Sequence, residues 1–271
     1  MPELPEVEAV VRTLRDGGLE VARLQAAHVV RPLVTRPQAH QDIEQLSSKT
    51  TVRHIRRRAK NIVIDLSNHH SLRIHLRMSG DLRLEAAEKT SGPSVRAWWQ
   101  LSGKRALVFT DARALGRVHI YPTDELNQLF EKLGPEPLSR EFTAQRFAAI
   151  ARVSRLPTKL FLMDQSKVAG LGNIYAAEAL FRARVSPFVP VQNLSSARLE
   201  ALRQAIRETL KAAVHSVYKA YKGPGGFRNH GDDFERLVYG RAGGKCTRCG
   251  RPIQRKQQGG RSTYFCAHCQ R

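Results

Sequence analysis

The chain has 271 residues, of which 45 are Lys or Arg and 24 are Asp or Glu, so its formal net charge is +21 at pH 7. Hydrophobic residues make up 41% of the chain, enough for two modest cores, which excludes a basic disordered tail. The basic residues recur along the whole sequence, and this distribution favours a long groove that neutralises the phosphate backbone of a polyanion.

Two other interpretations of the charge are a solvated basic surface and a face for an anionic membrane. No basic amphipathic anchor helix is evident, which disfavours the membrane. The chain holds no apolar run of 18 or more residues, and its first residues lack the charged and apolar regions of a signal peptide. We therefore expect a cytoplasmic protein with no membrane partner.

The chain begins with the sequence Met1-Pro2-Glu3-Leu4-Pro5-Glu6. Removal of Met1 would leave Pro2 with a free secondary amine, and because an α-amino group has a pKa of about 7.7 to 8.0, a useful share is unprotonated at neutral pH. Its condensation product with a carbonyl is an iminium that cannot lose its charge by deprotonation, so it acidifies the neighbouring carbon. Glu3 or Glu6 could then move protons. The terminus predicts a nucleophile for an aldehyde-like carbon.

The same residues also suit a helix that performs no chemistry. Pro5 is a good first residue of a helix, and Glu6 and Glu8 in a first turn complement the helix dipole. One apolar stripe with i, i+3, i+4, i+7 spacing precedes a Gly-Gly pair and consists of Val7, Val10, Val11 and Leu14. On these residues alone, structure and chemistry both remain open.

Residues 19 to about 121 are β-rich by pattern. The segment 71–78 alternates apolar and polar residues, with one face toward a core and the other carrying His75 and two arginines. Several further short runs are separated by turn residues, which indicates a sandwich or a barrel. After a short helix near 124–133, the prolines and glycine of Gly134-Pro135-Glu136-Pro137 predict a linker between domains.

The pattern becomes helical after this linker. Helices are expected at about 143–151, 158–163 and 174–184, with a longer one after Ser195. The turn Gly170-Leu171-Gly172-Asn173 joins two of them as in a DNA-docking element, and a helix N-terminus at such a turn fits a phosphate contact by Asn173. A simple helix connection is the alternative. A dinucleotide site is disfavoured because no strand precedes the Gly-x-Gly.

All four cysteines stand near the C-terminus as two Cys-x-x-Cys pairs separated by 16 residues: Cys246, Cys249, Cys266 and Cys269. In a reducing compartment this spacing predicts zinc rather than two disulfides. Four thiolates fill a tetrahedral site and leave no position for water, so the metal should be structural. Between the pairs, a Gly259-Gly260 turn with flanking arginines predicts a β-hairpin that carries Arg261.

Several longer segments resemble the sequences of one protein family. These segments are MPELPEVE at 1–8, RRAKNIV at 57–63, HLRMSG at 75–80, DAR-x-x-G at 111–116, LGPEPL at 133–138, LMDQSKVAGLGNIYAAEALF at 162–181, VYGR at 238–241 and the two cysteine pairs. Over nearly the whole chain they resemble the bacterial formamidopyrimidine-DNA glycosylases, relatives of endonuclease VIII that excise oxidised bases.

The resemblance implies an α+β fold with an N-terminal helix, a β-sandwich, a helical domain with a helix-two-turn-helix, and a C-terminal β-hairpin zinc finger. The implied boundaries are 1–133 for the catalytic domain, 134–140 for the linker, 141–236 for the helical domain and 237–271 for the zinc finger. It also implies one structural Zn²⁺ and a monomer that acts on double-stranded DNA at the bacterial nucleoid.

Catalytic roles follow from the resemblance by position. Pro2 resembles the nucleophile that attacks C1′ of the damaged nucleotide, and Glu3 resembles the general acid that opens the sugar ring. Glu6 stands where the family keeps a second acidic residue near the amine. The residues that resemble phosphate contacts around the lesion are Lys60, His75, Asn173 and Arg261, and Lys159 matches a further family lysine near the DNA.

Three residues resemble those that fill the gap left by an extruded base, namely Met78, Arg113 and Leu115. Flipping a base costs a few kcal/mol, so this gap must be filled. The third residue is usually phenylalanine in the family, and Leu115 can still enter the stack but lacks an aromatic face. Residues 222–236 also differ from the longer loop of family members that cap 8-oxoguanine. We therefore expect efficient cleavage at formamidopyrimidines and abasic sites and weaker activity on 8-oxoguanine.

The sequence thus predicts a bifunctional DNA glycosylase and abasic-site lyase of base excision repair, which cleaves the strand by β,δ-elimination through a Schiff base on Pro2. One alternative is an endonuclease VIII-like preference for oxidised pyrimidines or hydantoins. An alternative of another class is a non-catalytic zinc-finger DNA-binding protein, which would leave the terminal Pro-Glu pair without a role.

Overall fold

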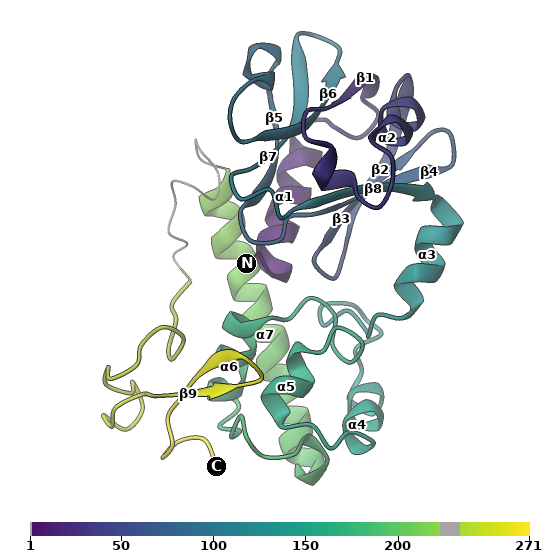
Figure 1. The fold of residues 1–271 in the computed structure, drawn as a ribbon. Helices are drawn as coiled ribbons and strands as arrows, with labels where there is room; N and C mark the ends of the chain where they lie inside the picture. The colour runs from purple at the N-terminus through teal and green to yellow at the C-terminus, as the bar shows by residue number, and fades with distance from the viewer. Residues whose placement is uncertain (1, 223–233) are drawn as a thin grey trace. The chain divides into compact units, whose positions relative to one another are not determined.

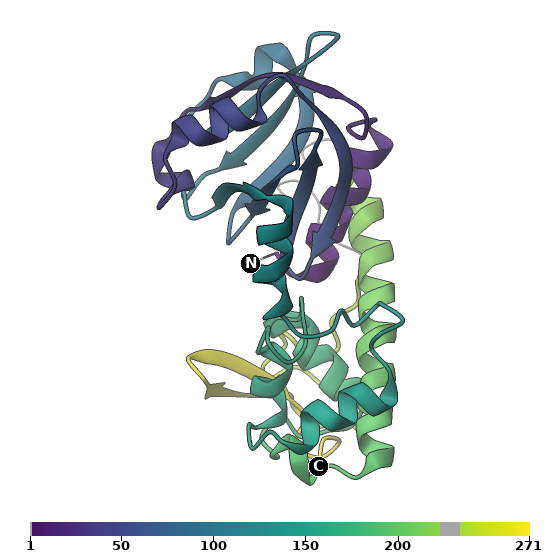
Figure 2. The ribbon, with the colours of Figure 1, turned by 90° about the vertical axis from the view of Figure 1, so that its right-hand side faces the viewer.

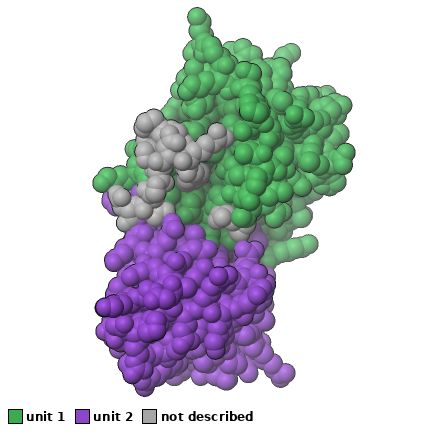
Figure 3. All heavy atoms as spheres, turned by 60° about the vertical axis from the view of Figure 1, so that its left-hand side comes forward, with its two compact units in different colours: residues 1–132, 217–232 green, residues 133–216, 233–271 purple. Residues whose placement is uncertain are grey.

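The structure, a computed structural model, describes residues 2–222 and 234–271 (Figure 1). The described chain forms two compact units, coloured separately in Figure 3. Unit 1 comprises residues 2–132 and 217–222, and unit 2 comprises residues 133–216 and 234–271. None of the helices among these residues is long and apolar enough to cross a membrane.

Unit 1 contains, in chain order, α1 (Leu4–Asp16), β1 (Arg23–Val29), the 3-10 helix η1 (Pro32–Thr35), α2 (His40–Ser47), β2 (Thr50–Arg58), β3 (Asn61–Leu66), β4 (His70–His75), β5 (Gly80–Ala86), η2 (Ala87–Thr90), β6 (Val95–Leu101), β7 (Arg105–Asp111), β8 (Arg117–Pro122) and α3 (Thr123–Glu131). Unit 2 contains α4 (Ala144–Arg152), α5 (Thr158–Met163), α6 (Asn173–Arg182), η3 (Val191–Asn193), most of α7 (Ser196–Tyr221), β9 (Gln254–Gln258) and β10 (Arg261–Phe265).

The strands of unit 1 form one sheet in the order β5-β7-β6-β1-β2-β3-β4-β8. Figure 2 draws the ribbon of this unit from a second side. The pairing of β1 with β2 has two residue pairs in register and joins two four-stranded halves. Buried side chains of both halves, such as Trp99 of β6 and Ile74 of β4, belong to one hydrophobic cluster, so the halves pack face to face. The expected α+β fold with a β-sandwich is confirmed.

Helix α1 places its predicted apolar stripe in this core. Val7, Val10, Val11 and Leu14 are each at most 1% exposed. The helix contacts β2 and β5, so its N-terminal residues are held against the sheet and do not form a free arm.

The register of the strands sets three turns beside one another at one end of the sheet. Asn61 of β3 pairs with His75 of β4, which also lies opposite Arg117 of β8. Gly80 of β5 pairs with Asp111 of β7. The turns that this register brings together are β2–β3 (59–60), β4–β5 (76–79) and β7–β8 (112–116).

Helix α7 belongs to both units. Its residues up to Ser216 group with unit 2, whereas Val217 and Tyr221 lie in the core of unit 1. The Tyr221 hydroxyl donates to Asp81 Oδ1 at 2.6 Å. The sequence places this whole helix in the 141–236 domain, but in the structure its last apolar residues pack into the sandwich.

The cysteine-bearing segment shares a core with α6. Ala177 and Phe181 of α6 pack with Val238, Ile253 and the buried cysteines. This segment, expected as a separate domain at 237–271, is therefore part of unit 2 in the structure. Most of the divergent 222–236 segment lies outside the described residues.

Candidate active site and nucleic-acid interface

The N-terminus of α1 brings two carboxylates close to Pro2. Glu3 is the N-cap residue and is 3% exposed. Its backbone N–H donates to Glu6 Oε2 at 2.8 Å, which completes a capping box. Glu6 therefore holds the backbone next to Pro2 in a fixed conformation, while Pro2 itself is half-buried. Met1 lies outside the described residues.

Helix α1 is attached to the turn that carries Lys60. Arg57 Nε pairs with Glu8 Oε2 at 2.9 Å, and Arg57 Nη1 donates to the Ala59 carbonyl at 3.0 Å. Burial raises the pKa of Glu8, but the charges of Arg57 and Arg12 and their hydrogen bonds outweigh it, so the pKa lies below its usual value. Glu8 stays ionised, and this half-buried pair sets α1 beside the β2–β3 turn, where Lys60 is 7% exposed.

His75 is neutral in the folded protein and has one defined tautomer. Burial, together with the charges of Arg77, Arg73 and Lys60, lowers the pKa of His75 to about 3. Its Nδ1 lies 3.0 Å from the Arg77 backbone N–H, which can only donate. Nδ1 must then be the acceptor, so the proton is on Nε2. The other side of the ring thus presents a hydrogen-bond donor suited to a phosphate oxygen.

This lowered pKa makes a prediction for acid stability. Below pH 6.5 the unfolded chain takes up a proton at His75, whereas the folded protein does so only near pH 3. The contribution of this residue to stability therefore falls as the pH drops from about 6.5 towards 3. His75→Gln should lose less stability across that range than wild type, as measured by urea unfolding at several pH values. The exposed His28→Gln is the control and should follow wild type; equal slopes for all three proteins would contradict the assignment.

The three predicted gap-filling residues are exposed at the same end of the sheet. Met78 on the β4–β5 turn is 43% exposed and Leu115 on the β7–β8 turn is 45% exposed, although both side chains are apolar. Arg113, two residues before Leu115, is also exposed. Large apolar side chains that stand in solvent beside an arginine fit insertion between base pairs.

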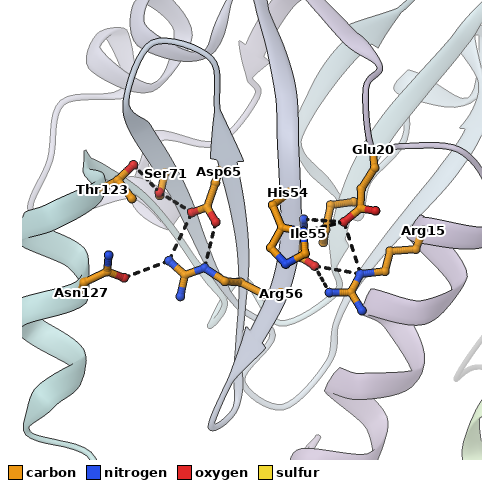
Figure 4. Close-up of polar contacts among 9 residues, drawn as sticks. All are labelled: Arg15, Glu20, His54, Ile55, Arg56, Asp65, Ser71, Thr123 and Asn127. Atoms are coloured by element: carbon orange, nitrogen blue, oxygen red, sulfur yellow. Dashed lines mark hydrogen bonds and ion pairs between the residues drawn. The ribbon is translucent and has the colours of Figure 1, made fainter.

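Many arginines of unit 1 are paired within the protein, as Figure 4 shows for the two sides of β2. On one side, Glu20 Oε1 accepts from the Ile55 backbone N–H at 3.0 Å and lies 2.9 Å from His54 Nδ1. Arg15 Nε lies 3.4 Å from the same oxygen and donates to the Ile55 carbonyl at 2.9 Å. Arg15 is therefore a brace between α1 and β2.

On the other side of β2, Arg56 Nε pairs with Asp65 Oδ2 at 2.8 Å, and Arg56 Nη2 donates to Asn127 Oδ1 at 3.0 Å (Figure 4). Ser71 donates to Asp65 Oδ1 at 2.6 Å and lies 2.9 Å from the Thr123 hydroxyl. Arg56 thus links β2 to β3 and α3, and its charge is compensated by Asp65.

In unit 2, Lys159 and Asn173 support the hairpin that carries Arg261. Lys159 is fully buried, and its Nζ donates to the Ser262 carbonyl at 3.0 Å and to Thr263 Oγ1 at 2.7 Å. Asn173 Nδ2 donates to the same carbonyl at 3.0 Å. Sequence reasoning gave Lys159 a contact with DNA, but the structure places its ammonium inside the protein, beneath the strand whose first residue is the exposed Arg261.

The β9–β10 hairpin has the geometry of a tight turn. Gly259 and Gly260 both have positive φ, 56° and 72°, as a two-residue hairpin turn requires. A Cβ on Gly259 would lie 2.8 Å from Leu160 Cδ2 of α5, so the turn packs closely against that helix. Arg261 follows directly and is held by a rigid turn.

The four cysteines form one compact cluster. Their sulfurs lie within 4.8 Å of one another, with 3.9 Å between Cys246 and Cys269 and 3.6 Å between Cys249 and Cys266. A tetrahedron with Zn–S bonds of about 2.3 Å has sulfurs about 3.8 Å apart, whereas a disulfide needs about 2.05 Å. The thiols are free and their spacing fits zinc.

The structure also identifies supporting residues that the sequence reasoning missed. Glu178 of α6 is fully buried, and its carboxylate accepts from the backbone N–H groups of Leu237, Val238 and Tyr239 at 2.8 to 3.0 Å. Glu178 therefore fixes the backbone at residues 237–239, at the start of the cysteine-bearing segment. An acidic residue within an otherwise apolar run, AAEALF, was the available signal.

Comparisons with known proteins agree along the chain. Residues 1–118 match the formamidopyrimidine-DNA glycosylase N-terminal domain, 133–221 its H2TH domain, and 243–271 a zinc finger found in FPG and IleRS. A formamidopyrimidine-DNA glycosylase of Xanthomonas campestris is 39% identical over 274 residues, covering all of both chains. That of Thermus thermophilus is 38% identical over 281 residues, covering 100% of this chain and 98% of its own.

The chain belongs to the formamidopyrimidine-DNA glycosylase family. Its structure resembles that of the family member from Lactococcus lactis in complex with DNA containing N7-benzyl-Fapy-dG, with a TM-score of 0.90, 30% identity and 99% coverage of both chains. The same protein bound to DNA with an abasic site gives a TM-score of 0.87 at 30% identity and the same coverage. Membership confirms the expected class, a DNA-binding glycosylase of base excision repair, and the cysteine cluster is its structural zinc site.

Proposed function

We propose that this family member is bifunctional, removing oxidised bases and then cleaving the DNA strand with Pro2 as its nucleophile. The observation that carries the proposal is the N-terminus of α1, where Glu3 is buried beside Pro2 and the capping box fixes their backbone. In the capping box the Glu3 carboxylate also accepts from the Glu6 backbone N–H, so this residue both orders the start of the helix and holds a carboxyl group beside Pro2.

The reaction begins with a chain in which Pro2 is the first residue. The Pro2 nitrogen attacks C1′, and the bond between C1′ and the damaged base breaks. Glu3 donates a proton to the ring oxygen O4′, and the sugar opens to an iminium that retains its positive charge. Loss of a proton from C2′ then breaks the C3′–O bond, and a second elimination breaks the C5′–O bond. Hydrolysis of the iminium releases the sugar remnant and leaves a gap flanked by phosphates.

The remaining site residues position the DNA. Lys60 and the Nε2–H of His75 bind phosphates near the lesion, and Arg261 with Asn173 binds the backbone from unit 2. Met78, Arg113 and Leu115 occupy the gap in the duplex. We further propose that the protein acts as a monomer in the bacterial cytoplasm, at the nucleoid.

Borohydride reduction with an abasic duplex tests this function. The protein beginning at Pro2 should form a covalent adduct with DNA, and peptide mapping should place the link on residue 2. DNA binding without any adduct would instead support a non-catalytic zinc-finger protein.

Lesion preference gives a separate prediction. Oligonucleotides that each carry one lesion should be cleaved efficiently at formamidopyrimidines and abasic sites and more slowly at 8-oxoguanine, because Leu115 offers no aromatic face for stacking. Leu115→Phe should raise activity on 8-oxoguanine about fivefold or more, since base–aromatic stacking contributes roughly 1–3 kcal/mol. Equal rates on 8-oxoguanine and formamidopyrimidine in wild type would contradict this, and a preference for oxidised pyrimidines would favour the endonuclease VIII-like alternative.

A further inference from the structure

The three gap-filling residues stand on two separate turns. Met78 belongs to the β4–β5 turn, and Arg113 and Leu115 belong to the β7–β8 turn. Under the proposed function all three enter one gap in the duplex together. Two exposed turns that moved independently would lose conformational entropy on insertion, so a link between them would favour the reaction.

Asp111, the last residue of β7, forms such a link. It is fully buried, and its Oδ2 accepts from the Gly116 backbone N–H at 2.6 Å. Its Oδ1 accepts from the Arg113 backbone N–H at 3.2 Å and from the hydroxyl of Ser79 in the other turn. One carboxylate therefore closes the β7–β8 turn from both ends and also holds the β4–β5 turn.

Ser79 is the bridge between the two turns. While its hydroxyl donates to Asp111, its oxygen also accepts from the Arg113 backbone N–H at 3.3 Å. Ser79 directly follows Met78 in the chain. The hydrogen bond from the Arg113 backbone N–H to Ser79 therefore holds the backbone beside Met78 against the backbone of Arg113.

The environment of Asp111 supports a positioning role. In the described part of the chain it makes no ion pair with a lysine, arginine or histidine, so its buried charge depends on the N–H and O–H donors of the two turns. Gly116 permits this approach, because a Cβ there would lie 2.6 Å from Phe109 Cζ and 3.1 Å from Asp111 Oδ2. The DAR-x-x-G segment thus contains its own anchor.

We propose that Asp111, with Ser79 as the bridge, is a positioning residue that couples the two turns so that Met78, Arg113 and Leu115 enter DNA as one preorganised unit. This inference rests on the proposed function. It assigns to Asp111 no contact with substrate and no part in the chemistry at Pro2.

The test uses the full chain beginning at Pro2 and compares Ser79→Ala with Ser79→Thr, which keeps the hydroxyl. Ser102→Ala, at the exposed β6–β7 turn, is the matched control. On a duplex with one formamidopyrimidine, Ser79→Ala should lower kcat about tenfold, the scale of one lost hydrogen bond to a charged group. Ser79→Thr should retain most of the activity. Single-stranded abasic DNA has no duplex gap, so its borohydride adduct should form at the wild-type rate in every variant.

A 2-aminopurine placed next to the lesion supplies a readout of insertion, since its fluorescence rises when neighbouring bases unstack. Ser79→Ala should reduce the amplitude of that rise. Wild-type excision and fluorescence in Ser79→Ala would overturn the inference, as would an equal loss on duplex and single-stranded substrates, which would indicate general damage to the fold. Failure of the proposed function differs from both, because wild type itself would then form no adduct.

Discussion

Any residue in front of Pro2 should abolish the covalent adduct with abasic DNA, and removal of that residue should restore it. An amide nitrogen shares its lone pair with the carbonyl and is not a nucleophile, whereas the free secondary amine is. The loss in lyase rate should be on the order of 10³-fold or more, as expected when a nucleophile is removed. A chain with a short N-terminal extension, assayed by borohydride trapping before and after protease cleavage ahead of Pro2, gives the comparison within one preparation.

Two controls separate chemistry from folding in this experiment. The uncleaved chain should still bind abasic DNA, because only the residue before Pro2 changes. Pro2→Gly keeps a terminal amine but forms an imine that can lose its charge, so it should give much less adduct. An adduct of the uncleaved chain that mapped to a lysine such as Lys60 would assign the nucleophile to that lysine.

Loss of zinc should unfold the C-terminal part of unit 2 and remove most DNA affinity. Structural zinc contributes about 10–16 kcal/mol of apparent binding free energy in small zinc-finger peptides, which is comparable with the total stability of a domain, about 5–15 kcal/mol. The hairpin has little core of its own, since four of the five residues of β9 are exposed. Without the metal, Arg261 should lose its position, and Lys159 and Asn173 should lose their shared acceptor at Ser262.

Hydrogen exchange after chelation measures this effect by region. Residues 243–271 should lose protection, while the sandwich core of unit 1 should retain it, and Cys249→Ser should reproduce the change without a chelator. All four cysteines of the chain belong to the cluster, so thiol titration reports its opening directly. Unchanged DNA affinity after complete release of zinc would contradict the role given to the hairpin.

Patterns of local origin were predicted from the sequence. The stripe of α1, the glycine turn before Arg261 and the two cysteine pairs each depend on residues close together in the chain, and the structure contains all three features. The resemblance to the family made the overall fold predictable as well, because the sequence segments that carry the resemblance lie in both units.

Features that depend on long-range register were not predicted. The bond between Ser79 and Asp111 joins residues 32 positions apart and arises only when β5 pairs with β7. The burial of Lys159 is of the same kind, since its acceptors at Ser262 and Thr263 lie more than 100 residues away. Sequence identifies such residues by type, whereas the direction of the side chain depends on elements that meet only in the folded protein.

The close packing of Gly259 on Leu160 has a consequence for how long the enzyme stays on DNA. Because the turn before Arg261 is already ordered, the proposed contact of its guanidinium with a phosphate would carry no further entropic cost for the hairpin. A contact of this kind is expressed mainly in the dissociation rate. Under the proposed function, the hairpin should therefore prolong the residence of the enzyme on DNA, so that the slower steps of base extrusion and elimination are completed before it leaves.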